Sequence, residues 1–199
     1  MSIYHSYIFS FLENNNISYA IVEDIKIKHR NSNIYKEDLD LVLDCKKDDV
    51  FTLLTNMNNF KHLEGNTFLE INNNLRIDLY FNYINVGYYY YLKINALDFH
   101  KKRINRIDYM IYQIIDPILK FSYYHDRHRY RIDFYFSSLD YNKLRNRLDG
   151  VIGVTISNII INKLLRSDFN FSRNFIKICK FRLLFINGNF VRMLKSRLL

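Results

Sequence analysis

Residues 35–44 have the sequence YKEDLDLVLD, which decides the fold because it places two carboxylates two residues apart on a predicted buried β-strand. Successive side chains of a strand alternate between the two faces of its sheet. The three leucines therefore share one face, which can be buried, and Asp38 and Asp40 share the other. Two carboxylates held so close repel each other unless a cation or a proton relieves the repulsion, and magnesium is the natural cation. The alternative interpretation is an ordinary polar strand end.

A third acid lies on a second strand-like run, RIDLY at residues 76–80, in which Asp78 alternates with apolar neighbours. A segment of helix length separates the two acidic runs, and Asp48 is its expected N-cap. Upstream, residues 17–22 (ISYAIV) have the composition of another strand of the same sheet. The Asn run at residues 72–74 predicts a tight turn, so that the strand before it and the RIDLY strand form a hairpin.

With these elements in place, the chain resembles the nucleotidyltransferase fold of the DNA polymerase beta superfamily. In that superfamily a first strand leads into a short helix, the next strand carries a D-x-D pair, and a later strand brings a third acid. More narrowly, the chain resembles the small nucleotidyltransferase-family proteins encoded among bacterial surface-polysaccharide genes. The motifs that carry the resemblance lie in residues 1–95. It implies that Asp38, Asp40 and Asp78 bind Mg²⁺ or Mn²⁺, that a nucleoside triphosphate is the substrate, and that Asp78 helps to deprotonate the attacking hydroxyl.

One feature departs from the family pattern. Members usually carry a glycine-containing pair just after the first strand, where the bare backbone approaches the nucleotide phosphates. Here residues 23–24 are acidic, and the first glycine of the chain is Gly65. Lys26, Lys28 and Arg30 follow and are predicted to hold the phosphates instead. Two interpretations stay open: the nucleotide is bound in this other way, or the domain is a catalytically inactive scaffold or binding protein.

The predicted fold class is α+β, with a nucleotidyltransferase-like mixed sheet of four or five strands in residues 17–92 followed by a helical C-terminal half. The predicted domains are residues 1–95, nucleotidyltransferase-like, and residues 96–199, helical. The period of the apolar residues changes from two to three or four near the boundary between them. Residues 82–92 are compatible with either a last strand or a covering loop.

Three sequence signals shape the predicted helical half. Asp116-Pro117 should interrupt the first helix, because proline lacks a backbone donor and clashes with the preceding turn. Residues 125–131 (HDRHRYR) predict a basic surface, and Gly150 is expected to separate two helices.

The last segment, residues 169–199, predicts a basic amphipathic helix, because it contains seven basic residues and no acidic residue in a chain of net charge +9. We expect it to attach to an anionic surface, with membrane lipid as the favoured partner and nucleic acid as the less favoured one. The alternative is a final helix that packs on the core and leaves its basic face solvated.

Composition limits the cellular setting. Two cysteines among 199 residues are too few for a disulfide framework, and no signal peptide or membrane span is expected from the sequence. We therefore predict a cytoplasmic protein, with peripheral attachment to the inner face of the membrane as a further expectation. A basic nucleic-acid-binding protein, or the nucleotidyltransferase of a toxin–antitoxin pair, is a third interpretation, carried by the excess positive charge alone.

Overall fold

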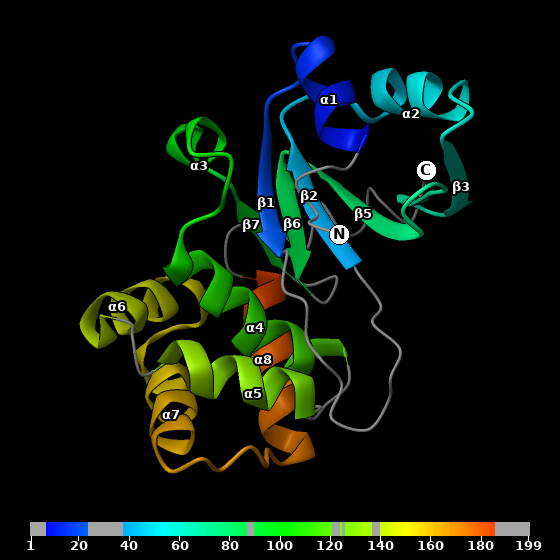
Figure 1. Ribbon diagram of the computed structural model, residues 1–199. Helices are drawn as coiled ribbons and strands as arrows, with labels where there is room; N and C mark the ends of the chain where they lie inside the picture. Colours follow the sequence, from blue (N-terminus) through cyan, green and yellow to red (C-terminus); the bar gives the residue numbers. More distant parts are fainter. Residues whose placement is uncertain are drawn as a thin grey trace. The chain divides into compact units, whose positions relative to one another are not determined.

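The computed structural model describes residues 7–23, 38–86, 90–120, 124, 126–136 and 140–185. It has two compact units, one of Met1–Ile84 with Lys93–Ile104 and one of Asn85–Leu92 with Asn105–Leu199. The fold is α+β, as predicted: the first unit contains a five-stranded mixed sheet with helices, and helices α4 to α8 form the C-terminal part (Figure 1).

The five strands are arranged in the order β1-β2-β5-β4-β3. β2 runs parallel to β5, whereas the other three neighbouring pairs are antiparallel. The two acidic strands of the sequence are therefore adjacent and parallel at the centre of the sheet. The strands are β1 (Tyr19–Glu23), β2 (Asp38–Leu43), β3 (Phe60–Glu64), β4 (Thr67–Glu70) and β5 (Leu75–Phe81).

β4 and β5 form the predicted hairpin. The turn between them contains Asn74 with φ of 49°, a left-handed conformation that asparagine tolerates better than most residues. The sequence did not predict β3, because Phe60 is its only buried residue and its other four side chains are exposed. An edge strand of this kind has no apolar alternation that would mark it.

The main core lies on the leucine face of the sheet. Helices α1 (Tyr7–Asn14) and α2 (Lys47–Thr55) cover this face. The predicted burial of the leucine row is confirmed, because all three side chains are fully buried. The cluster brings together helix and strand residues that include Ile8, Phe11, Leu12, Leu39, Leu41, Leu43, Val50, Leu54, Phe68, Ile77 and Leu79.

One detail of these helices differs from expectation. Asp48 was expected to be the N-cap of α2, but Lys46 occupies that position without a side-chain cap. Asp48 lies in the first turn instead, where its negative charge is favourable at the positive end of the helix dipole.

Glu70 ties the start of α1 to the sheet. This carboxylate at the end of β4 is fully buried, and its Oε2 accepts a hydrogen bond from the backbone N–H of Ile8 at 3.2 Å. The side-chain amide of Asn73 donates to Oε1. The first N–H groups of a helix lack hydrogen-bond partners within the helix, and a carboxylate at that end can accept from one of them. Its negative charge also interacts favourably with the positive end of the helix dipole.

A second, two-stranded sheet pairs β6 (Tyr83–Val86) with β7 (Tyr90–Lys93), so the segment whose structure was left open forms strands. Helix α3 (Ala96–His100) follows, capped by the side chain of Asn95. The chain then passes along the free edge of β1, where Arg103 forms a parallel bridge with Ile21.

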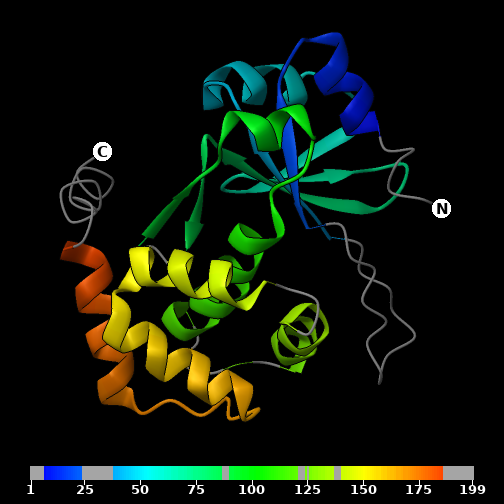
Figure 2. The ribbon, with the colours of Figure 1, turned by 90° about the vertical axis from the view of Figure 1, so that its left-hand side faces the viewer.

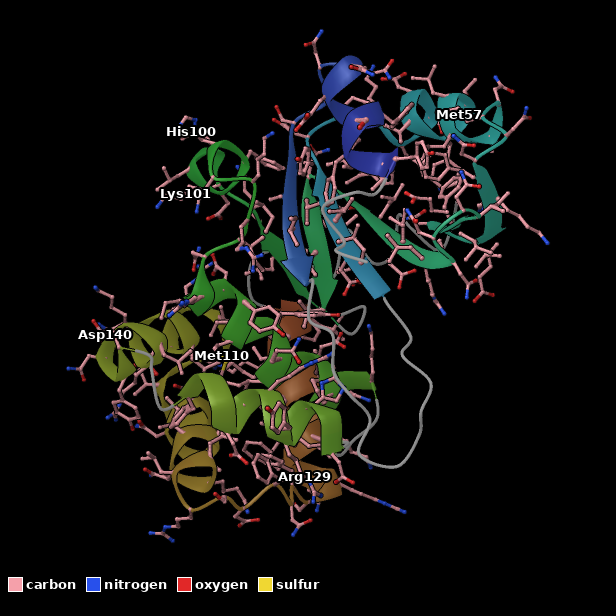
Figure 3. The ribbon with its side chains drawn as sticks, in the orientation of Figure 1. Met57, His100, Lys101, Met110, Arg129 and Asp140 are labelled. Atoms are coloured by element: carbon pink, nitrogen blue, oxygen red, sulfur yellow. The ribbon has the colours of Figure 1, made fainter. Side chains whose placement is uncertain are left out.

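The C-terminal part is helical, as predicted, and α4 is its most buried element. Met110 on this helix, labelled in Figure 3, is fully buried. The helices, which Figure 2 shows from the side, are α4 (Arg106–Lys120), α5 (Asp126–Phe136), α6 (Tyr141–Ile152), α7 (Val154–Leu165) and α8 (Arg173–Phe185).

The prediction that Asp116-Pro117 interrupts this helix is wrong, because α4 continues through Pro117 to Lys120. Proline removes one backbone hydrogen bond near the helix end. All residues from Gln113 to Leu119 are buried, and this packing offsets the local cost.

The predicted basic surface at residues 125–131 is wrong for His128, which is buried in α5 and hydrogen-bonded through Nδ1 to Oε1 of Gln113 at 3.2 Å. The prediction for Gly150 is also wrong, since it lies inside α6. The break occurs at Gly153, whose φ of 88° favours glycine.

Within the described residues, no helix is both long enough and apolar enough to cross a membrane. Residues 186–199 of the predicted basic helix lie outside the described residues.

Candidate functional site

Asp40 of β2 and Asp78 of β5 are direct register partners on neighbouring parallel strands. The Cα atoms of such partners are about 4.8 Å apart, and their side chains point to the same face. The structure therefore brings together two of the three acids that the sequence singled out, from positions 38 residues apart in the chain.

The two acids lie on the face of the sheet opposite the main core. Their strand neighbours Leu41 and Leu79 are buried on the core side, whereas Asp40 and Asp78 are only partly buried. The side chain of Asp78 is 30% exposed. This accessibility leaves the carboxylates able to meet a ligand.

Asp38 begins β2 and is the register partner of Arg76. Its backbone position places it one strand repeat from Asp40 on the same face. Its side chain lies outside the described part of the chain, so the share of Asp38 in a metal site stays a prediction.

Two neighbours hold one oxygen of Asp78. The hydroxyl of Thr67 donates a hydrogen bond to Oδ1 at 2.5 Å, and Nε of Arg76 donates to the same oxygen at 3.4 Å. Thr67 is buried at the start of β4 and is the register partner of Asp78. A hydrogen bond to an ionised acceptor is shorter and stronger than a neutral one, so Thr67 is well suited to orient this carboxylate.

Sequence analysis missed Thr67, although a signal for it existed. The turn between β4 and β5 was predicted from the Asn run. Once that turn is fixed, antiparallel pairing outward from it places Thr67 opposite Asp78. The register of the predicted hairpin would therefore have identified Thr67 as the residue opposite Asp78.

The backbone of β1 adds one more acidic position to this row, because Glu23 pairs with Asp40 after a register shift. Its side chain is outside the described part of the structure. Lys26, Lys28 and Arg30, the predicted phosphate-binding residues, also lie outside it, so their role stays a prediction.

The donor set suits a magnesium ion that is shared with a substrate. Among the described residues there is no cluster of three or more histidine, cysteine, aspartate or glutamate side chains that could hold a metal ion. The register pair supplies two carboxylates, and magnesium is commonly bound by one or two carboxylates together with water and substrate phosphates. Two carboxylates therefore suit a metal ion that is also coordinated by a phosphate-bearing ligand better than one that is held by the protein alone.

Comparison of the chain with protein-family models, with curated proteins and with solved structures gives no match. No family is therefore shown for this chain, and the proposed activity depends on the sequence resemblance and on the geometry of the acidic pair.

Proposed function

We propose that this chain is a metal-dependent nucleotidyltransferase that transfers a nucleotidyl group to a hydroxyl acceptor. The observation that carries the proposal is the register pairing of Asp40 with Asp78 on adjacent parallel strands, on the face of the sheet opposite the main core, where both acids are only partly buried. Two neighbouring carboxylates favour the binding of a divalent cation, and nucleoside triphosphates commonly bind together with Mg²⁺ or Mn²⁺. Asp38 is the third proposed ligand.

In this proposal, the carboxylates of Asp40 and Asp78 would hold the divalent cation that accompanies the triphosphate. When bound, the metal neutralises the charge that develops on the phosphate oxygens. The acceptor oxygen forms a bond to the α-phosphorus, the bond from that phosphorus to the bridging oxygen breaks, and pyrophosphate leaves with the electron pair.

Asp78 is the proposed acceptor of the hydroxyl proton. Its Oδ1 receives hydrogen bonds from Thr67 and Arg76, and no described residue donates a hydrogen bond to its Oδ2. The fixed orientation of the carboxylate therefore leaves Oδ2 for the proton or the metal. The guanidinium of Arg76 adds a positive charge beside the site, which is favourable for a bound triphosphate.

A catalytically inactive nucleotidyltransferase-fold scaffold is the second candidate function. The specific observation that favours it is the pair of acidic residues at positions 23–24, where the family resemblance leads one to expect a glycine-containing turn. The setting in surface-polysaccharide synthesis follows from the resemblance alone and stays a prediction. The toxin–antitoxin alternative is carried by the excess positive charge alone and also stays a prediction.

Calorimetric titration distinguishes these functions. MgCl₂ and then ATP, GTP, CTP or UTP are titrated into the wild type, Asp40→Asn and the control Asp44→Asn. Asp44 is an exposed acid directly after β2, so its substitution changes the charge equally without touching the register pair. We expect at least one nucleotide to bind to the wild type and to Asp44→Asn only when metal is present, and about tenfold more weakly to Asp40→Asn.

Two results contradict the proposal. If the wild type binds no nucleotide in the presence of Mg²⁺ or Mn²⁺, catalysis is excluded and the scaffold function is favoured. If nucleotide binds equally well with and without metal, the acids are not the site, and the basic residues at 26, 28 and 30 become the candidates.

A further inference from the structure

Helix α8 has two apolar faces. Ile176, Cys179 and Leu183 are buried and pack the helix against the rest of its unit, where it lies beside α4 and α6 (Figure 2). The second face carries Ile178, 56% exposed, and Phe181, 65% exposed. An amphipathic helix that only closes a core has a single apolar face.

The exposed apolar residues share one side of the helix. Ile178 and Phe181 are three residues apart and Phe181 and Phe185 are four apart, the two spacings that place helical side chains together. The rings of Phe181 and Phe185 pack with their centroids 4.5 Å apart. At about 100° per residue, this side is opposite the buried one. We call Ile178, Phe181 and Phe185 the outer face of α8.

Single exposed apolar side chains are ordinary on protein surfaces, whereas a contiguous group indicates an interaction site. The charges around the outer face indicate its partner. Arg173 and Lys177 are exposed, and Lys177 lies four residues before Phe181, next to the outer face. α8 contains no acidic residue, and neither does any part of residues 169–199. An acidic partner surface with an apolar layer beneath it matches both properties.

The surface of a bilayer with anionic lipid has this combination, because headgroup phosphates lie above acyl chains. Nucleic acid matches the charge, but an aliphatic side chain such as Ile178 gains little from it. A second protein copy matches the apolar side chains, but two copies of this face would bring basic residues against each other.

We propose that the outer face of α8 docks peripherally on anionic lipid bilayers, with Ile178 and Phe181 inserted at the headgroup boundary and Arg173 and Lys177 against the phosphates. This surface is independent of the nucleotidyltransferase proposal, because none of its residues belongs to the acidic site. Attachment would keep the protein at the membrane surface, close to membrane-bound partners.

Vesicle sedimentation tests the proposal with the full chain. The vesicles are phosphatidylcholine alone or phosphatidylcholine with phosphatidylserine, at low and at high salt. We expect binding only to the phosphatidylserine vesicles, weakened by salt. The double variant Ile178→Ser/Phe181→Ser should bind about tenfold more weakly, because each buried apolar group contributes to interfacial affinity. Arg173→Glu/Lys177→Glu should reduce binding by a similar factor.

The matched control is Ile71→Ser/Leu97→Ser, which removes two side chains of the first unit that are 50% and 55% exposed. This control should bind vesicles like the wild type. Far-ultraviolet circular dichroism and thermal unfolding establish that each variant is folded, and calorimetric titration of nucleotide should be the same for all of them.

Four outcomes overturn the proposal. The first is equally negligible binding of the wild type to both kinds of vesicle, and the second is unchanged binding by a folded Ile178→Ser/Phe181→Ser variant. The third is a wild-type dimer in light scattering that this variant abolishes, which makes a second copy the occupant. The fourth is displacement of the wild type from vesicles by RNA at low concentration, which makes nucleic acid the preferred partner.

Discussion

The hydroxyl of Thr67 donates a hydrogen bond to Oδ1 of Asp78 across the β4–β5 hairpin, at 2.5 Å. Thr67 has no proposed part in the proton transfer itself. Its hydrogen bond orients Asp78, the acid that is proposed to take the hydroxyl proton. It makes Thr67 a positioning residue for the candidate site, and the role can be separated from a purely structural one.

Thr67→Val should keep the shape of the side chain and remove the hydrogen bond. We expect Mg²⁺-dependent nucleotide affinity to fall by about tenfold, and stability by about 1 kcal/mol. Thr67→Ser, which keeps the hydroxyl, should restore the affinity. Calorimetric titration measures the affinity, and urea unfolding measures the stability. A loss of stability in Thr67→Val with unchanged nucleotide affinity would show that the contact is only structural.

Asp40→Asn and Leu41→Ala separate a functional acid from a core residue on the same strand. In the absence of metal, Asp40→Asn removes repulsion from Asp78, so the free energy of unfolding should stay unchanged or rise slightly. Leu41→Ala opens a cavity at a fully buried position and should cost about 2–5 kcal/mol. Chemical denaturation of both metal-free proteins tests this contrast. A large destabilisation by Asp40→Asn would mean that the carboxylate serves the fold.

Glu70→Ala should destabilise the protein by about 1–3 kcal/mol, because it leaves the backbone donor of Ile8 buried without this acceptor. Glu70→Gln keeps one acceptor oxygen for Ile8, but it loses the acceptor for the amide of Asn73 and the favourable charge at the helix start, so its cost should be smaller, about 0.5–1.5 kcal/mol. Urea unfolding measures both. Equal effects of the two substitutions would show that the hydrogen bond to Ile8 contributes little.

Gly153→Ala and Gly150→Ala should change stability in opposite directions. Gly153 has φ of 88°, and an added Cβ would lie 2.5 Å from Nε of Arg182, which donates to the carbonyl of Ile152. We expect a loss of about 1–2 kcal/mol. Gly150 is inside α6 with open space around it, so alanine there should add up to about 1 kcal/mol. Thermal unfolding of the two variants gives the signs, and a stabilising Gly153→Ala would contradict the assigned break between α6 and α7.

Both cysteines should react slowly with iodoacetamide in the native protein. Burial, with smaller contributions from Asp49 and Asp44, raises the pKa of Cys45 to about 11, and burial raises the pKa of Cys179 to about 12. The thiolate is the reactive form, so a pKa three units above the working pH leaves about one thiol in a thousand ionised. Labelling at pH 8 should therefore be slow, rise with pH towards 11 for Cys45, and become fast in urea. Fast native labelling at pH 8 would place the thiols at the surface.

The sequence by itself determined the local elements. Alternation of leucine and aspartate in residues 38–43 predicted both the strand and its buried face, and the Asn run predicted the β4–β5 turn. These features depend on the period of side chains and on the backbone preferences of single residues, which act within a few positions of the chain. The change of period likewise predicted a sheet followed by helices.

Only the tertiary structure decided which residues meet. The parallel register that pairs Asp40 with Asp78, the burial of His128 against Gln113 and the continuation of α4 through Pro117 each depend on packing partners distant in the chain. The second apolar face of α8 also became visible only when the first face was seen to be buried. Periodicity tells which residues share a face, but burial of that face is a property of the whole fold, because the free energy of removing apolar surface from water depends on what covers it.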